Sequence, residues 1–80
     1  MNIRVLLFAH LRDIAGAELS LDVQLGSSAE ELCAKLAGID ERFGRSLAST
    51  RIAVNGEWAD GATILHDGDE LALIPPVSGG

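Results

Sequence analysis

The stretch DGDELALIPPVSGG, residues 67–80, contains a turn, a strand and a proline stop in direct succession. The letters DGD favour a tight turn, because Asp accepts local backbone hydrogen bonds and Gly adopts left-handed angles without strain. Residues 70–74 predict a strand that is apolar on both faces, as in a central position of a sheet. Two prolines cannot continue a hydrogen-bonded ladder, so the strand should end there before the chain reaches Gly79 and Gly80.

The first half of the chain predicts a hairpin. Residues 2–8 and residues 19–25 both alternate in the way strands do, and one helical turn closed by Gly16 is expected between them. In the first strand the expected buried face carries Ile3, Val5 and Leu7, and the opposite face carries Arg4, Leu6 and Phe8. In the second strand the expected inward residues are Leu19, Leu21, Val23 and Leu25.

Residues 26–38, GSSAEELCAKLAG, are the clearest helix signal. Either Ser27 or Ser28 can form a capping box with the glutamate three residues later, and Gly38 is expected to end the helix. The buried stripe follows helical spacing and comprises Ala29, Leu32, Cys33 and Leu36. Cys33 should therefore be a small buried core residue and not a reactive thiol.

The second half of the chain predicts a short helix around Phe43, then a strand in RIAVNG and an antiparallel return in EWA. The return is expected because Asn-Gly, at positions 55 and 56, is a strong tight-turn dipeptide. The complete order of elements fits an α+β roll, in which a mixed sheet carries one main helix packed on one face.

One main helix can cover only one face of such a sheet. Leu6, Phe8 and Ile74 should then look outward on the uncovered face, and Trp58 on the short return strand can join them. Aromatic and aliphatic side chains gathered on a small domain are typical of a protein interface. We therefore expect this apolar patch to bind a protein partner.

Charge and composition exclude several classes of function. The 80 residues carry a net charge of −6, and Arg51 is the last basic residue, so the segment leading to the final strand is acidic. Such a field repels nucleic acid and anionic membranes and favours a basic protein surface. No apolar run approaches the roughly 18 residues of a membrane span, and no signal-peptide pattern begins the sequence. With a single cysteine, these features predict a cytoplasmic protein.

The sequence contains no familiar catalytic or metal-binding pattern. His10 and His66 lack neighbouring ligands, and one cysteine cannot build a zinc cluster. A calcium loop, a phosphate loop and a nucleophile with its base are all absent from the sequence. We therefore expect no bound metal or cofactor and no autonomous enzyme activity.

The remaining reactive group is the terminal carboxylate of the chain. A carboxylate becomes an acyl donor only after activation, for example as a mixed anhydride with AMP. Two terminal glycines have no Cβ, so they can thread into a narrow enzyme site that excludes other residues. The predicted organisation is a folded domain over residues 1–76 and a flexible Gly-Gly tail over residues 77–80.

The VNG turn, the DGDELALIPP stretch and the Gly-Gly end resemble the ubiquitin-like sulfur carriers, which have a β-grasp fold. LLFAHLRD near the start and PPVSGG at the end are similar to the small-subunit family of molybdopterin synthase in particular, and the similarity spans nearly the whole chain. It implies that Gly80 bears the acyl group and the sulfur and that Gly79 is the threading residue. The partner-binding residues that it implies, together with the patch above, are Phe8, Trp58, Ile74, Pro75, Pro76 and Val77.

The same resemblance implies a cycle with several partners. A ubiquitin-activating-like adenylyltransferase would use ATP with magnesium to adenylate Gly80, and a sulfur donor such as a cysteine desulfurase or a rhodanese-type protein would convert it to a thiocarboxylate. The carrier would then insert its tail into the large subunit of molybdopterin synthase. There it would give sulfur to cyclic pyranopterin monophosphate, a step in molybdenum cofactor biosynthesis. Zinc and ATP would belong to the activating enzyme, and the carrier would not be an enzyme alone.

Two alternatives remain open at the level of the sequence. VNGEW also resembles the thiamine-pathway carrier, so the chain could carry sulfur for thiamine, cysteine or another product, although the paired prolines and FAHLR argue against this. The other alternative is a β-grasp module that only binds, or that is joined through Gly80 to lysines of other proteins.

Overall fold

The computed structural model of the chain describes residues 1–76. Val77, Gly79 and Gly80, which the sequence analysis singled out, lie outside these residues. The elements in chain order are β1 (Asn2–Leu7), the 3-10 helix η1 (Ala9–Leu11), α1 (Arg12–Ala15), β2 (Glu18–Asp22), α2 (Ala29–Ile39), α3 (Glu41–Leu47), β3 (Arg51–Val54), β4 (Glu57–Ala59) and β5 (Glu70–Ile74).

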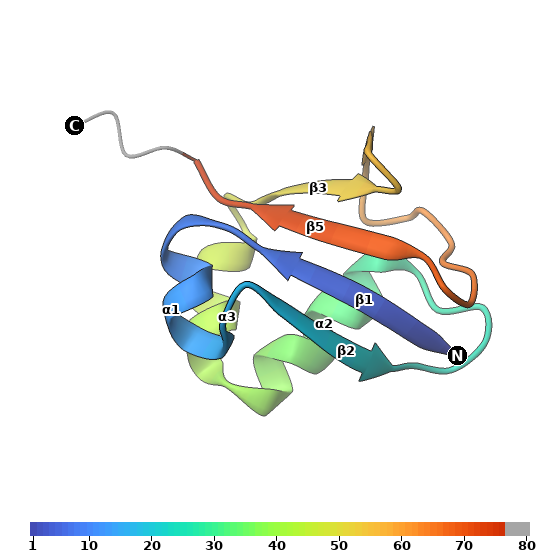
Figure 1. Ribbon diagram of the computed structural model, residues 1–80, viewed down its shortest axis with the longest axis horizontal. Coiled ribbons are helices and arrows are strands. Elements are labelled where there is room, and N and C mark those ends of the chain that lie inside the picture. The colour runs from blue at the N-terminus through green and yellow to red at the C-terminus, as the bar shows by residue number, and fades with distance from the viewer. Residues whose placement is uncertain (77–80) are drawn as a thin grey trace.

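The described strands form one mixed sheet in the order β2-β1-β5-β3-β4. β1 and β5 are parallel neighbours at its centre, whereas the β1–β2, β3–β5 and β3–β4 pairs are antiparallel. Figure 1 shows α2 and α3 on the same side of this sheet, with β5 between β1 and β3. The expected α+β roll is confirmed, and β5, which was predicted to be apolar on both faces, is its central strand.

The core lies between the sheet and the two longer helices. Ile3, Val5 and Leu7 are at most 1% exposed, and Leu71 and Leu73 of β5 are fully buried beside them. The ladder pairs Val5 with Leu71 and Leu7 with Leu73, so these residues form one continuous apolar surface. The other described members of this cluster are Leu11, Leu21, Val23, Ala29, Leu32, Cys33, Leu36, Phe43 and Leu65.

The structure decides between the two capping boxes at the start of α2. Ser28 is the cap: its Oγ accepts from the main-chain N–H of Glu31 at 3.3 Å, and its own N–H donates to Glu31 Oε1 at 3.1 Å. Ser27 instead donates its hydroxyl hydrogen to the main-chain oxygen of Gln24 at 2.7 Å, in the turn that precedes the helix. The first N–H groups of a helix have no hydrogen-bond partner within the helix. The residue whose side chain accepts from them therefore determines where the helix begins.

The predicted end of α2 at Gly38 is wrong. Gly38 lies inside the helix, which ends at Ile39. Asp40 is the residue that separates the two helices, because its N–H still donates to Leu36 O at 3.0 Å while its carboxylate accepts from Arg42 N at 3.0 Å and begins α3. Because the Asp40 side chain caps α3 directly after α2 ends, no glycine follows the last residue of α2.

The second strand is shorter than predicted, and Leu25 is not an inward residue. β2 ends at Asp22, although the N–H of Val23 still donates to Met1 O at 2.9 Å. The chain then turns, with Ser27 N donating to Gln24 O at 3.1 Å, and Leu25 is left 83% exposed. The alternation of apolar residues continues beyond the point where the ladder stops.

Candidate functional site

The helix-free face of the sheet, called the open face below, carries a row of small and large apolar side chains. The register aligns Leu6 with Ala72, Ala72 with Ala53, and Ala53 with Trp58, so one residue from each of four strands shares this face. Residues directly opposite each other in a ladder project to the same side. The expected outward direction of Leu6 and Trp58 therefore follows from the observed pairing.

A second row lies on the open face where β5 ends. Leu7 pairs with Leu73, so the next residues, Phe8 and Ile74, come side by side on the opposite face. Arg51 pairs with Ile74 from the other side. Phe8 is 42% exposed and Trp58 is 59% exposed, whereas Ile74 is half-buried. The structure thus places Phe8, Ile74 and Trp58 on one face, with Trp58 two strands away from Ile74 in the row of Ala72, while their binding role stays a prediction.

The chain leaves the sheet at this same end. Pro75 is buried and Pro76 is exposed directly after the last residue of β5. In Figure 1 the strands β1 and β5 point in the same direction, toward the end of the sheet at which the chain leaves. Phe8 and Ile74 therefore lie at the end of the open face from which the chain continues beyond Pro76.

Arg51 was missed as a site residue by the sequence analysis. Its guanidinium carbon lies 4.1 Å from the centroid of the Trp58 ring, which is a cation–π contact. The signal was available, because Arg51 lies two residues before Ala53 and so shares the face of Ala53 and Trp58. Recognising it required the register of β3 against β4, which the turn at Asn55 sets.

The two arginines on the open face have different surroundings. Arg4 forms ion pairs with Glu70 and with Glu18, and hydrogen bonding and charge from Glu70 raise the pKa of Arg4 further above its ordinary value. The ion pairs found among residues 1–76 do not include Arg51. Within residues 1–76, the charge of Arg4 at the start of β5 is thus paired with carboxylates, whereas Arg51 near the end of β5 has no ion-pair partner.

The turn that precedes β5 is held by side-chain hydrogen bonds. Asp69 accepts from Asn55 Nδ2 at 2.9 Å and from the main-chain N–H of His66 at 2.8 Å. These bonds, the one from Asn55 first, keep the pKa of Asp69 below its ordinary value. The expected use of the acidic turn for local backbone bonding is confirmed.

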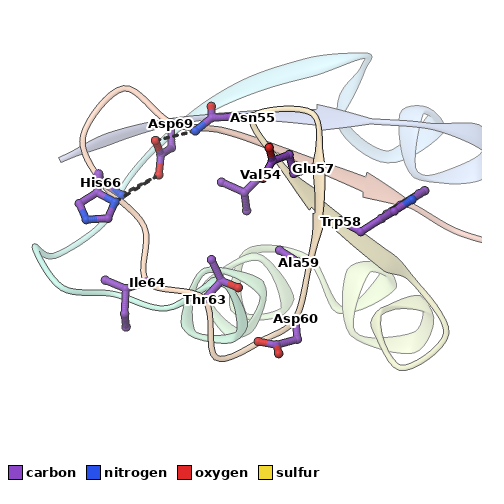
Figure 2. Close-up of a pocket in the computed structure, with 10 residues that line it drawn as sticks. All are labelled: Val54, Asn55, Glu57, Trp58, Ala59, Asp60, Thr63, Ile64, His66 and Asp69. Atoms are coloured by element: carbon purple, nitrogen blue, oxygen red, sulfur yellow. Dashed lines mark hydrogen bonds and ion pairs between the residues drawn. The ribbon is translucent and has the colours of Figure 1, made fainter.

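A broad hollow of about 710 Å³ lies beside this turn, between the β3–β4 hairpin and the segment before β5. Figure 2 shows the residues that line it. Its lining residues are Val54, Asn55, Glu57, Trp58, Ala59, Asp60, Thr63, Ile64, His66 and Asp69. The hydrogen-bonded groups drawn there, Asn55 and Asp69, are engaged in holding the fold. The hollow lies at the start of β5, whereas the chain leaves the sheet at its other end.

No group of three or more His, Cys, Asp or Glu residues within residues 1–76 could hold a metal ion. Cys33 is 9% exposed, and burial raises the pKa of its thiol to about 11, which disfavours the nucleophilic thiolate. None of the helices of residues 1–76 is long and apolar enough to cross a membrane.

The fold and the exposed apolar face beside the end of β5 define a ubiquitin-like protein of the β-grasp class. The structure is similar to that of SAMP1 from Haloferax volcanii, with a TM-score of 0.87 and 29% identity over 100% of both chains. A ubiquitin from Caldiarchaeum subterraneum shares the fold, with a TM-score of 0.66 at 21% identity over 100% of this chain and 98% of that one.

Within this class the family can be stated. The ThiS family model matches residues 5–80, and the chain belongs to that family. A molybdopterin synthase sulfur carrier subunit from Chlamydomonas reinhardtii is 35% identical over 100% of both chains. The chain also resembles one in a complex of subunits 1 and 2 of the molybdopterin-converting factor from Helicobacter pylori, with a TM-score of 0.71 and 28% identity over 100% of both chains.

Proposed function

We propose that this protein is the sulfur carrier subunit of a molybdopterin synthase. The observation that carries the proposal is the position of the apolar patch, because Phe8 and Ile74 lie on the open face at the end of the sheet from which the chain continues to Gly-Gly, and Trp58 lies on the same face. A partner that docks on this patch is adjacent to the start of the tail. The 35% identity to a named sulfur carrier subunit over 100% of both chains supports the same function.

In the proposed reaction the carboxylate of Gly80 attacks the α-phosphorus of ATP on a ubiquitin-activating-like adenylyltransferase. Pyrophosphate leaves, and the product is an acyl-adenylate, a mixed anhydride that is reactive toward nucleophiles. The outer sulfur of a persulfide on a donor such as a cysteine desulfurase or a rhodanese-type protein then attacks the acyl carbon and displaces AMP, which forms an acyl disulfide. A thiol reductant cleaves its S–S bond and is oxidised to a disulfide, which leaves a thiocarboxylate on Gly80. ATP, its magnesium ion and zinc are used by the activating enzyme.

The sulfur is then delivered inside the large subunit. The tail enters that subunit while the apolar patch docks on its surface, and the thiocarboxylate transfers its sulfur to cyclic pyranopterin monophosphate. Gly79 permits close passage because it has no Cβ. The pterin site belongs to the large subunit, so the carrier supplies sulfur and position and is not an enzyme alone. The small, acidic domain is consistent with a protein partner and with a location in the cytoplasm.

Intact mass spectrometry tests the sulfur step. After incubation with the activating enzyme, ATP and a sulfur source, the protein should gain the mass of one sulfur-for-oxygen exchange. A variant without Gly80 should keep the melting temperature of the wild type and show no such gain. An unchanged wild-type mass, with an activating enzyme that is active on its own carrier, would contradict the proposal.

A second candidate function is attachment to other proteins. Similarity to the small archaeal modifier protein 1 of Haloferax volcanii, at 27% identity and a TM-score of 0.84 over 95% of this chain and 98% of that one, favours it. In this case Gly80 would be joined to lysine amines of targets. Isopeptide-linked adducts that appear in cells with the wild type, and not with the variant lacking Gly80, would support this candidate.

Complementation of strains lacking the molybdenum-cofactor carrier or the thiamine carrier separates the two sulfur pathways.

A further inference from the structure

The pair formed by Arg51 and Trp58 is a feature of the open face that the sulfur chemistry does not use. Arg51 lies opposite Ile74 in the β3–β5 ladder, and its guanidinium lies over the Trp58 ring at 4.1 Å. Both side chains are exposed. A charged group is thus held at a defined point of the apolar patch, next to the strand end from which the tail continues.

We propose that Arg51 is a specificity-determining residue that takes a carboxylate of the large subunit when the carrier docks. The proposal rests on the proposed function, because it deepens the interface which that function requires. The occupant of this part of the open face is an acidic side chain on a protein surface that is otherwise apolar at the point of contact.

The geometry of the guanidinium supports a carboxylate as its partner. The guanidinium carbon of Arg51 lies over the Trp58 ring at 4.1 Å, and the N–H groups that do not face the ring can donate to a partner. A carboxylate accepts two such parallel bonds, whereas a cation or an apolar group accepts none. The stacking also restricts the side chain before binding, so less rotamer entropy is lost when the contact forms.

The charges on the open face make this contact selective. Arg4, the other arginine of that face, is already paired with Glu18 and Glu70. The net charge of −6 attracts a basic surface at long range, but a basic group placed directly against Arg51 would be repelled. A correct partner must therefore be basic overall and present one carboxylate at this point. That requirement excludes basic proteins that match the net charge alone.

The surrounding side chains would strengthen the pair. Phe8, Ile74 and Trp58 form an apolar rim whose contact with a partner removes water from the ion pair. Attraction between opposite charges increases as the local dielectric constant falls. Trp and Arg are also enriched among the few residues that contribute most of the binding energy of an interface.

Charge reversal with a matched control tests the proposal. The affinity of the purified large subunit is measured by calorimetry for the wild type, Arg51→Glu and Arg45→Glu. Arg45 lies on α3, is 71% exposed and pairs with Glu41, so its reversal changes the net charge equally at a site away from the patch. Arg51→Glu should weaken binding about tenfold or more, and Arg45→Glu should change it about twofold or less.

Two further variants separate the contact from general effects. Arg51→Lys keeps the charge and loses the planar fork, so its affinity should fall between those of the wild type and Arg51→Glu. Acidic residues of the large subunit are also replaced one at a time by lysine. One of these variants should bind Arg51→Glu more tightly than the wild-type large subunit does. Circular dichroism melts should show that all variants remain folded.

The outcomes distinguish this inference from the function on which it rests. If the wild type accepts sulfur and binds the large subunit, but Arg51→Glu binds as tightly as Arg45→Glu, the role of Arg51 is overturned and the sulfur carrier function stands. If the wild type does neither, the proposed function itself fails. A carrier that dimerises through this face, shown by a dimer that Arg51→Glu dissociates, would also overturn the inference.

Discussion

The side chain of Asn55 donates to Asp69 Oδ1 at 2.9 Å and also accepts from the main-chain N–H of Glu70 at 3.0 Å. One residue therefore connects the β3–β4 turn with the turn that starts β5. Asn55 has a left-handed φ of 51°, which Asn tolerates better than most residues, and Gly56 follows it with φ of 83°. The tight turn and the central strand are thus positioned by the same side chain.

Asn55→Gly should lower the free energy of unfolding by about 1–2 kcal/mol, because both side-chain bonds are lost while the left-handed angle stays accessible. Urea titration followed by circular dichroism measures the change. Ala48→Gly, at an exposed position that ends α3, is a control for adding one glycine. A midpoint equal to that of the wild type would show that the two bonds contribute nothing.

Stability should fall in acid as Asp69 becomes protonated. Hydrogen bonds from Asn55 and His66 lower the pKa of Asp69 in the folded state, so its contribution is fully present above the unfolded value of about 3.9 and is lost as the pH falls through the lower folded value. Urea titrations between pH 2 and pH 7 measure this. Asn55→Gly removes the main cause of the lowered pKa. The free energy of unfolding of this variant should therefore fall less in acid than that of the wild type. An identical pH profile for both proteins would contradict the assignment.

Ser28→Ala should destabilise the fold by about 1 kcal/mol, because it removes the cap of α2 and leaves the N–H of Glu31 without its partner. Ser28→Asn retains an accepting oxygen and should retain most of the stability. Thermal melts of the two variants measure the difference. Equal losses for Ala and Asn would indicate that the size of the side chain, and not the cap, determines the effect.

Trp58→Ala should weaken binding to the large subunit by about tenfold or more, as truncation of a central aromatic does. Its stability should change much less, since the ring is 59% exposed and its described polar contact is with Arg51. Leu25→Ala is the matched control, because Leu25 is an exposed apolar residue outside the patch. Similar binding by both variants would argue that the open face is not the interface.

Gly79→Val should reduce the rate of thiocarboxylation without changing the melting temperature, because a branched Cβ obstructs passage through a narrow site. The measurement is a time course of intact mass after addition of the activating enzyme, ATP and a sulfur source. Ser78→Val places the same side chain one residue earlier and should have the smaller effect. A wild-type rate for Gly79→Val would contradict the threading role.

Most of the fold could be predicted because apolar periodicity reports burial directly. The alternation in β1 identified Ile3, Val5 and Leu7 as core residues, and the Asn-Gly dipeptide located the β3–β4 turn. The errors lie at element ends. Leu25 continues an apolar pattern into a turn, and Gly38 continues a helix that Asp40 ends by capping the next one. Ends depend on hydrogen-bond partners, which a pattern does not contain.

The sequence by itself determined the strands, the main helix and the Gly-Gly end, because periodicity, caps and prolines act over a few neighbouring residues. Only the tertiary structure decided which residues meet on the open face. Phe8, Ile74 and Arg51 are far apart in the chain, and the parallel β1–β5 and antiparallel β3–β5 registers bring them together. Register is set by packing of the whole sheet against its helices, since a shift of one residue would turn every side chain to the other face.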